Sequence, residues 1–147
     1  MNQYMKIAVE EAYKGIRAGH GGPFGCVIVK NGAVIGQGHN EVVRLSDPTC
    51  HGEIMAIRHA CRTIRSFDLS GCELYTTAEP CPMCAGAIQW ANIRKVYYGC
   101  TVFDTKEIGF RDEDFYSDSR RFSEELDRAE CLEVFEEYKA IENKTYY

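Results

Sequence analysis

The chain has 147 residues, of which 45% are hydrophobic and 27% are charged, and its net charge is -5. These values predict a soluble globular protein with a single core, and the negative charge argues against a broad nucleic-acid-binding surface. The first residues lack the apolar core of a secretory signal, and no apolar run is long enough to cross a bilayer. We therefore expect a cytoplasmic protein whose eight cysteines are thiols or metal ligands rather than disulfides.

The N-terminal part of the chain predicts a helix followed by a β-hairpin. Residues 2–18 carry apolar side chains near a 3.6-residue period, which is typical of an amphipathic helix. Residues 24–29 are apolar and β-branched, which indicates a buried strand, and residues 33–38 follow as an antiparallel strand. Asn31-Gly32 between them is a typical two-residue hairpin turn.

The middle of the chain predicts two helix–strand units. Residues 41–49 are polar and are expected to form a loop. Helices are predicted over 51–64 and 81–91, and a strand after each, over 72–76 and 95–99. Alternating helices and strands in a small domain favour parallel strand pairing with helices packed on the sheet.

The C-terminal part gives a weaker pattern. Residues 100–122 are expected to be loop with short turns, and apolar spacing over 123–143 predicts an amphipathic helix. Together these elements predict one domain over 1–147. Its fold class is α/β, a three-layer α/β/α arrangement with a mixed central sheet of four to five strands flanked by helices.

Two short motifs contain the residues with the clearest chemistry. His51-Gly52-Glu53 opens one predicted helix, and Cys81-Pro82-Met83-Cys84 opens the next. His51, Cys81 and Cys84 are good zinc ligands, and three protein ligands leave the fourth tetrahedral position for water, as in catalytic zinc sites. The pattern H-x-E…P-C-x-x-C is typical of zinc-dependent nucleobase deaminases. We therefore predict one Zn²⁺ per subunit.

Glu53 is better suited to moving protons than to binding the metal. We expect Glu53 to accept a proton from water activated by zinc, to deliver it to a ring nitrogen, and then to protonate the leaving amine. The other histidines, His20, His39 and His59, lack partners at ligand spacing, so surface positions or ordinary hydrogen bonds are expected for them.

The chain resembles the cytidine deaminase-like superfamily and, within it, the bacterial guanine deaminases. The resemblance covers nearly the whole chain. Besides the two zinc motifs it includes 21–25, 47–49, 87–91 and the segment containing Gly109, Phe110 and Asp112.

The resemblance implies a set of substrate-binding residues. Asn40 is expected to hydrogen-bond the purine, Phe24 and Trp90 to line or close the ring pocket, and Asp112 to contact the base. In this family the C-terminal segment crosses to the neighbouring subunit of a homodimer. The resemblance thus implies a domain-swapped dimer in which Tyr147 caps the partner's site.

Gly52 completes the substrate-binding set, and it also marks a departure. Guanine deaminases usually have alanine between the histidine and the glutamate, whereas fungal-type cytosine deaminases also have glycine there.

The leading hypothesis is therefore hydrolytic deamination of guanine to xanthine and ammonia, in purine catabolism or salvage. Cytosine, a nucleoside and amino-triazines are alternative substrates. A further alternative is adenosine in transfer RNA, since residues 78–81 and 83–87 also resemble that branch, although the acidic composition offers little basic surface. A non-catalytic, zinc-stabilised binding module is the alternative from a different class.

Overall fold

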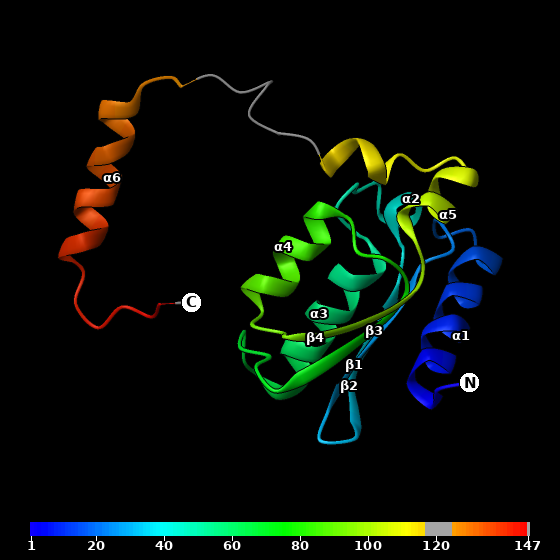
Figure 1. Ribbon diagram of the computed structural model, residues 1–147. Helices are drawn as coiled ribbons and strands as arrows, with labels where there is room; N and C mark the ends of the chain where they lie inside the picture. Colours follow the sequence, from blue (N-terminus) through cyan, green and yellow to red (C-terminus); the bar gives the residue numbers. More distant parts are fainter. Residues whose placement is uncertain (117–124, 147) are drawn as a thin grey trace. The chain divides into compact units, whose positions relative to one another are not determined.

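Figure 1 shows the computed structural model, which describes residues 1–116 and 125–146. They belong to two units: the larger, residues 1–116, contains the sheet, and the smaller contains one helix, α6. The expectation of one domain over 1–147 stays a prediction. None of the described helices is long and apolar enough to span a membrane.

The elements are α1 (Gln3–Arg17), β1 (Gly25–Lys30), β2 (Ala33–His39), α2 (Val42–Leu45), α3 (Gly52–Ile64), β3 (Cys72–Ala78), α4 (Pro82–Trp90), β4 (Lys95–Cys100), α5 (Val102–Glu107), the 3₁₀ helix η1 (Asp112–Tyr116) and α6 (Arg128–Ala140).

Among the described residues the strands form one mixed sheet in the order β2-β1-β3-β4. β1 pairs antiparallel with β2 and with β3, whereas β3 and β4 are parallel. The predicted turn at Asn31-Gly32 joins β1 to β2, and both residues have positive φ, as a two-residue hairpin turn of type I′ requires. Parallel pairing was predicted for the helix–strand units, and β3 with β4 confirms it. The described residues contain four strands, within the predicted range of four to five, and residues 117–124 lie outside them.

Helices cover both faces of the sheet, which confirms the predicted α/β/α layers (Figure 1). β1 is buried along almost its whole length because it lies in the middle of the sheet. Its successive side chains point to opposite faces: Val27 and Val29 pack with Ala8 of α1, and Cys26 and Ile28 pack in the core formed with α3 and α4.

Helix α3 lies unusually close to β2 because two strand positions are glycine. A Cβ atom on Gly36 would lie 2.6 Å from the Ala56 carbonyl oxygen and 2.7 Å from the Ala60 Cβ. One on Gly38 would lie 2.7 Å from the Met55 Cβ. The glycines therefore set how near α3 approaches the sheet, and so where the N-terminus of α3 is placed.

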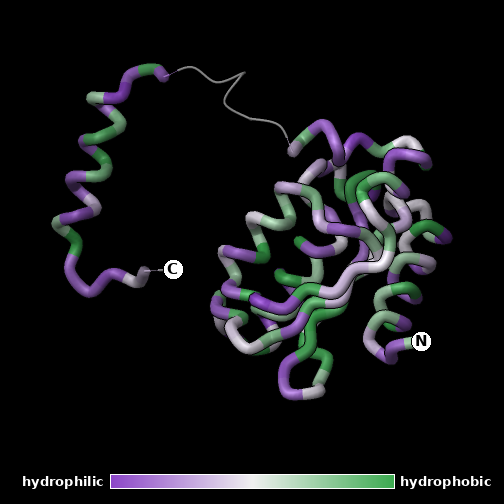
Figure 2. Tube along the Cα trace, in the orientation of Figure 1, coloured by the Kyte–Doolittle hydropathy of each residue, from purple (hydrophilic) through white to green (hydrophobic). Residues whose placement is uncertain are grey.

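Three segments differ from the sequence-based expectation. Residues 41–49 contain the short helix α2, and the region from residue 100 contains α5, whose first turn is closed by a capping box between Thr101 and Asp104. The helix expected over 123–143 is shorter, Arg128–Ala140, and all its residues are partly or fully exposed. Figure 2 shows hydrophobic and hydrophilic residues alternating along α6.

The segments that bear the predicted motifs meet at one end of the sheet. β1 begins there and β2, β3 and β4 end there, as the pairing of Cys26 with Gly38 and Thr76, and of Ala78 with Cys100, shows. α3 and α4 both begin at this end, directly after His51 and Cys81. The fold therefore brings two helix N-termini to one place.

A pair of identical substitutions tests the close approach of α3. Gly36→Ala should lower the free energy of unfolding by about 1–3 kcal/mol, because the methyl group overlaps the α3 backbone. Gly86→Ala is the matched control: it lies inside α4 with no atom within 4 Å of the added methyl group, and should be neutral or stabilise by about 0.5–1 kcal/mol. Denaturant unfolding at equal zinc and protein concentration measures both. Equal stability of the two variants would contradict the packing argument.

Candidate active site and metal centre

The three predicted zinc ligands lie together at the N-termini of α3 and α4. The Nδ1 atom of His51 is 3.6 Å from the Sγ atoms of both Cys81 and Cys84. His51 and Cys81 occupy the N-cap positions of the two helices, and Cys84 lies one turn into α4. The spacing of Cys81 and Cys84 in the sequence predicts that their sulfur atoms lie together. The packing of α3 beside α4 brings His51 to the same place.

The donor set fits a zinc ion. Zn–S bonds of about 2.3 Å and a Zn–N bond of about 2.0 Å in tetrahedral geometry place nitrogen and sulfur about 3.5 Å apart, close to the 3.6 Å observed. The two sulfurs and the ring nitrogen lie within 4.8 Å of one another. Two thiolates balance the charge of Zn²⁺, so the ion can be buried at low electrostatic cost.

Glu53 lies beside this donor set and is almost completely buried. Its Oε1 accepts a hydrogen bond of 3.0 Å from the hydroxyl of Thr76, and its Oε2 accepts one of 3.2 Å from the Cys84 thiol. Burial raises the pKa of Glu53, which favours its protonated form. A carboxylate held in this way is a competent proton acceptor next to a metal.

The contact between the two cysteines shifts the pKa values of their thiols in opposite directions. A hydrogen bond from Cys84, together with one from His51, lowers the pKa of Cys81 to about 4. The same contact with Cys81 raises the pKa of Cys84, and the nearby carboxylate of Glu53 raises it further. The hydrogen bond to Cys81 also raises the pKa of His51. The positive ends of the α3 and α4 dipoles favour negative charge at the same point.

A cavity of about 600 Å³ is lined by His51, Cys81 and Glu53, and Cys84 lies buried behind them. Its volume lies within the usual range for small-molecule sites, roughly 300–1,000 Å³. Phe24, the residue before β1, and Phe110 both line the cavity. Their rings pack edge to face, with centroids 4.9 Å apart. Phe24 was predicted from the resemblance, and its partner Phe110 was not.

Asn40 and Asp112, both predicted to bind substrate, also line the cavity. Asn40 follows β2 and is buried; its Oδ1 accepts a hydrogen bond of 3.1 Å from the Val42 backbone N–H, so its Nδ2 group is the end that can donate. Asp112 begins η1, and partial burial raises the pKa of its carboxyl, as does the charge of Cys81.

Of the residues predicted to bind substrate, two do not line the cavity and one lies outside the described residues. Gly52 begins α3 and does not line the cavity; a Cβ there would lie 3.0 Å from the Phe24 carbonyl oxygen, so glycine allows close packing against the strand. Trp90 ends α4, is 67% exposed and does not line the cavity. Tyr147 lies outside the described residues.

Sequence reasoning missed two parts of the site. Thr76 points to Glu53 from β3, and the only sequence signal is its position on a strand that ends just before the second motif. The wall formed by Gly109, Phe110, Arg111 and Phe115 was assigned no role beyond Asp112. Its aromatic residues follow a glycine, a pattern that also occurs in ordinary loops.

Comparison with known families gives a direct match. Residues 1–100 match the family model described as the cytidine and deoxycytidylate deaminase zinc-binding region. The matched range contains all three predicted zinc ligands and Glu53, whereas the cavity wall at 109–115 lies outside it.

Individual proteins show the same relationship. Guanine deaminase of Bacillus subtilis is 42% identical over 98% of this chain and 97% of its own length. An X-ray structure of guanine deaminase from that organism has a TM-score of 0.90 at 41% identity, covering 100% of this chain and 99% of the other. The tRNA-specific adenosine deaminase of Aquifex aeolicus is 44% identical over 72% of this chain and 68% of its own length. The chain therefore belongs to the cytidine and deoxycytidylate deaminase family, and is a zinc-dependent aminohydrolase.

Proposed function

We propose that the substrate of this aminohydrolase is free guanine, which is converted with water to xanthine and ammonia. The main support is the extent of the similarity to a guanine deaminase, which covers nearly the whole chain. It therefore includes the cavity wall at 109–115, which lies beyond the region matched by the general deaminase family model. Since this wall lines the same cavity as His51, Cys81 and Glu53, it is in a position to select the base.

The polar groups of the cavity suit guanine. The ring N–H and the 2-amino group of guanine are adjacent donors, and the carboxylate of Asp112 can accept from them. The Nδ2 group of Asn40 can donate to an acceptor of the purine. Phe24 and Phe110 offer aromatic surface to the planar ring. Bound structures of a relative support purine recognition, since that protein was solved with 8-azaguanine and with 2,6-diaminopurine.

In the proposed reaction His51, Cys81 and Cys84 would hold the zinc ion, which would lower the pKa of water toward about 7 and so supply a nucleophile at neutral pH. Glu53 accepts a proton from the attacking water and delivers it to the ring nitrogen beside the carbon that bears the amino group. Glu53 then moves the second proton to that amino group, which leaves as ammonia while the carbon–oxygen bond becomes a carbonyl.

Thr76 fits this scheme as a positioning residue. Its hydroxyl donates to one oxygen of Glu53, while the other oxygen lies near Cys84. One carboxylate oxygen is thereby held in place and the other remains on the metal side. The raised pKa of Glu53 agrees with a group that must carry a proton during the reaction.

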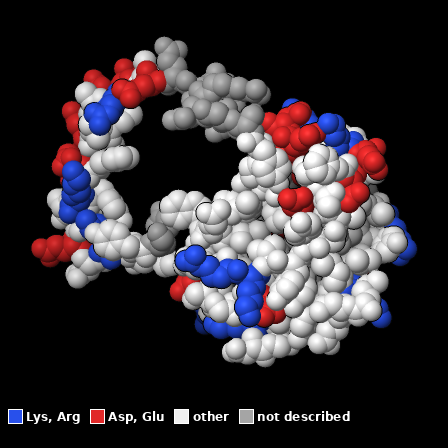
Figure 3. All heavy atoms as spheres, in the orientation of Figure 1, with Lys and Arg blue, Asp and Glu red and all other residues white. Residues whose placement is uncertain are grey.

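Transfer RNA is the main rival substrate because several relatives are tRNA-specific adenosine deaminases. RNA binding depends on neutralising phosphates with lysine and arginine. The net charge of -5 opposes this, and Figure 3 shows a largely uncharged surface over α4, a few basic side chains near the start of β4, and acidic groups near η1. These observations favour a small-molecule base.

We also infer that the chain works as a homodimer whose C-terminal segment packs on the partner. In the described part of α6 no residue is buried, although Val134, Phe135 and Tyr138 are large apolar residues. A helix of this kind gains stability by covering its apolar side against another surface. In this arrangement Tyr147 would cap the partner's cavity.

A substrate panel tests the choice of base. Zinc-loaded protein is expected to release ammonia from guanine with a kcat/KM at least about 100-fold above those for cytosine, adenine and guanosine. Asp112→Asn should lower kcat/KM for guanine about 10- to 100-fold, because a hydrogen bond to a charged group is worth about 1.5–3 kcal/mol. Fast turnover of cytosine without turnover of guanine would reject the proposal.

Substitution of Glu53 separates catalysis from zinc binding. Glu53→Gln should keep one zinc ion per chain and lower kcat by about 10²–10⁴-fold, because general acid–base catalysis is lost. Cys81→Ser should lose both zinc and activity, whereas Cys131→Ser, at an exposed thiol of α6, should lose neither. Metal analysis and ammonia release measure these effects. A Glu53→Gln protein with normal kcat would support a binding module or a different base.

Sedimentation equilibrium tests the dimer. Phe135→Glu places a charge on the apolar side of α6 and should shift the protein toward monomer. Glu133→Gln, in the same helix, is the control and should leave the dimer intact. If the unmodified protein sediments as a monomer at micromolar concentration, the proposed exchange of C-terminal segments is wrong.

A further inference from the structure

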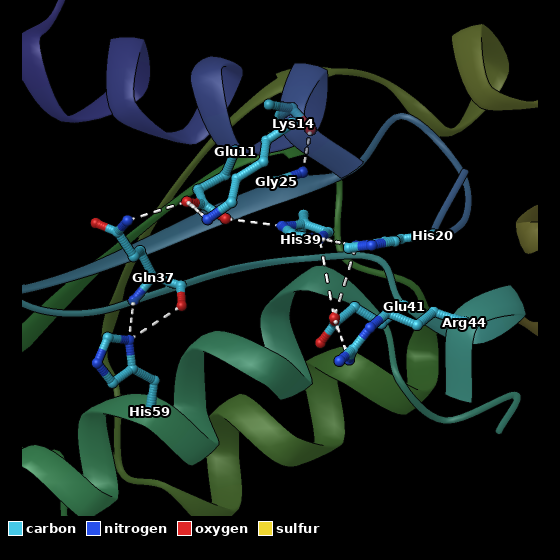
Figure 4. Close-up of polar contacts among 10 residues, drawn as sticks. Glu11, Lys14, His20, Gly25, Gln37, His39, Glu41, Arg44 and His59 are labelled. Atoms are coloured by element: carbon cyan, nitrogen blue, oxygen red, sulfur yellow. Dashed lines mark hydrogen bonds and ion pairs between the residues drawn. The ribbon is translucent and has the colours of Figure 1, made fainter. Parts of the chain in front are cut away.

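Two histidines and a glutamate gather outside the zinc centre, at the end of β2. The Nδ1 atom of His20 is 2.8 Å from the Nε2 atom of His39. The Oε1 atom of Glu41 is 3.7 Å from the first nitrogen and 4.0 Å from the second. Figure 4 shows the three side chains pointing toward one another from the loop after α1, from β2 and from the residue before α2.

The ring of His39 is held in a fixed orientation. Its Nδ1 atom lies 2.8 Å from the Oε2 of Glu11, a buried carboxylate on α1. The other oxygen of Glu11 accepts a hydrogen bond of 3.0 Å from the side chain of Gln37. On the α1 side the ring is tightly packed, since a Cβ on Gly15 would lie 2.7 Å from its Cδ2 atom. The Nε2 atom is thus directed toward His20 and Glu41.

We propose that His20, His39 and Glu41 form a second metal site, for a divalent first-row transition ion such as Zn²⁺. Imidazole nitrogen and carboxylate oxygen are common zinc ligands. A metal-binding histidine usually donates its other ring N–H to a carboxylate, which fixes the tautomer. Glu11 holds that position relative to His39, so both the ligands and their supporting shell are present.

The distances require only a small adjustment. Ligands about 2.0–2.1 Å from a tetrahedral zinc are about 3.4 Å apart, and the three observed separations are 2.8, 3.7 and 4.0 Å. The His20 side chain is the one expected to move, because it is 25% exposed whereas that of His39 is 8% exposed. Arg44 competes for the site, since its guanidinium lies 2.9 Å from the same Glu41 oxygen. Arg44 is half exposed and can turn away.

The proposed ion would connect two walls of the substrate cavity. His20 precedes Gly21 and Gly22, which line the cavity, and His39 and Glu41 flank Asn40, which also lines it. The His20 carbonyl already accepts hydrogen bonds of 3.0 Å from the backbone N–H groups of Val43 and Arg44. A metal ion would add a stronger link between the same segments and hold Asn40 in place.

The alternative occupant is a proton. In the absence of metal, the ring N–H of His20 can donate to His39, and the ring N–H of His39 can donate to the carboxylate of Glu11. This series of hydrogen bonds satisfies the same atoms. The two states differ in what they bind, so metal stoichiometry separates them directly.

The test is a titration of zinc-loaded protein with Co²⁺ or Zn²⁺, followed by dialysis and metal analysis. We expect two ions per chain in the unmodified protein. The second cobalt ion should give only weak visible bands, without sulfur-to-metal absorption, since its ligands are nitrogen and oxygen. His20→Asn and Glu41→Gln should each bind one ion, and Glu11→Gln should weaken the second ion about 10- to 100-fold. Arg44→Gln should tighten it.

His59→Asn is the matched control, because His59 is an exposed histidine on α3 that hydrogen-bonds the Gln37 backbone from outside the cluster. It should bind two ions. Retention of the first zinc and an unchanged circular dichroism spectrum verify that each variant is folded. One ion per chain in the unmodified protein at saturating metal, or two ions in folded His20→Asn, would overturn the proposal.

Discussion

The approach of two helix N-termini to one point is the constraint on which this structure depends. α3 and α4 begin at the same end of the sheet, and their first residues supply His51, Cys81 and Cys84. Each helix begins with backbone N–H groups and a partial positive charge, so the point between them favours thiolate and carboxylate groups. Metal binding, the buried Glu53 and the cavity all follow from that convergence.

The sheet makes this approach possible. Because β1 lies between β2 and β3 and is antiparallel to both, the residues that follow β2 and β3 emerge at the end where β1 begins. Glycines on β2 let α3 lie close to the strand, and helices on both faces leave little freedom to shift. The same end of β2 bears His39, Asn40 and Glu41, so the cavity and the proposed second metal site share one structural support.

The residues proposed to carry out the reaction and those proposed to select the base lie in different segments of the chain. The zinc ligands, Glu53 and Thr76 lie on α3, α4, β3 and the residues just before the two helices, within the part shared with deaminases in general. Phe110, Asp112 and Phe115 lie beyond that part and line the same cavity as His51, Cys81 and Glu53. Under the proposed function, the common core would supply the reaction and the later segment would fit the base.

The sequence alone determined the metal-binding chemistry and most of the elements, because zinc requires particular residue types at short spacings and because apolar periodicity is local. Cys81 and Cys84 are three residues apart, and Asn31-Gly32 has one favoured turn. Only the tertiary structure decided which residues meet across the fold. Thr76 reaches Glu53, Phe110 meets Phe24, and His20 lies beside His39, although each pair is separated by at least 19 residues. Such contacts depend on strand order and helix packing, which leave no mark at fixed spacing in the sequence.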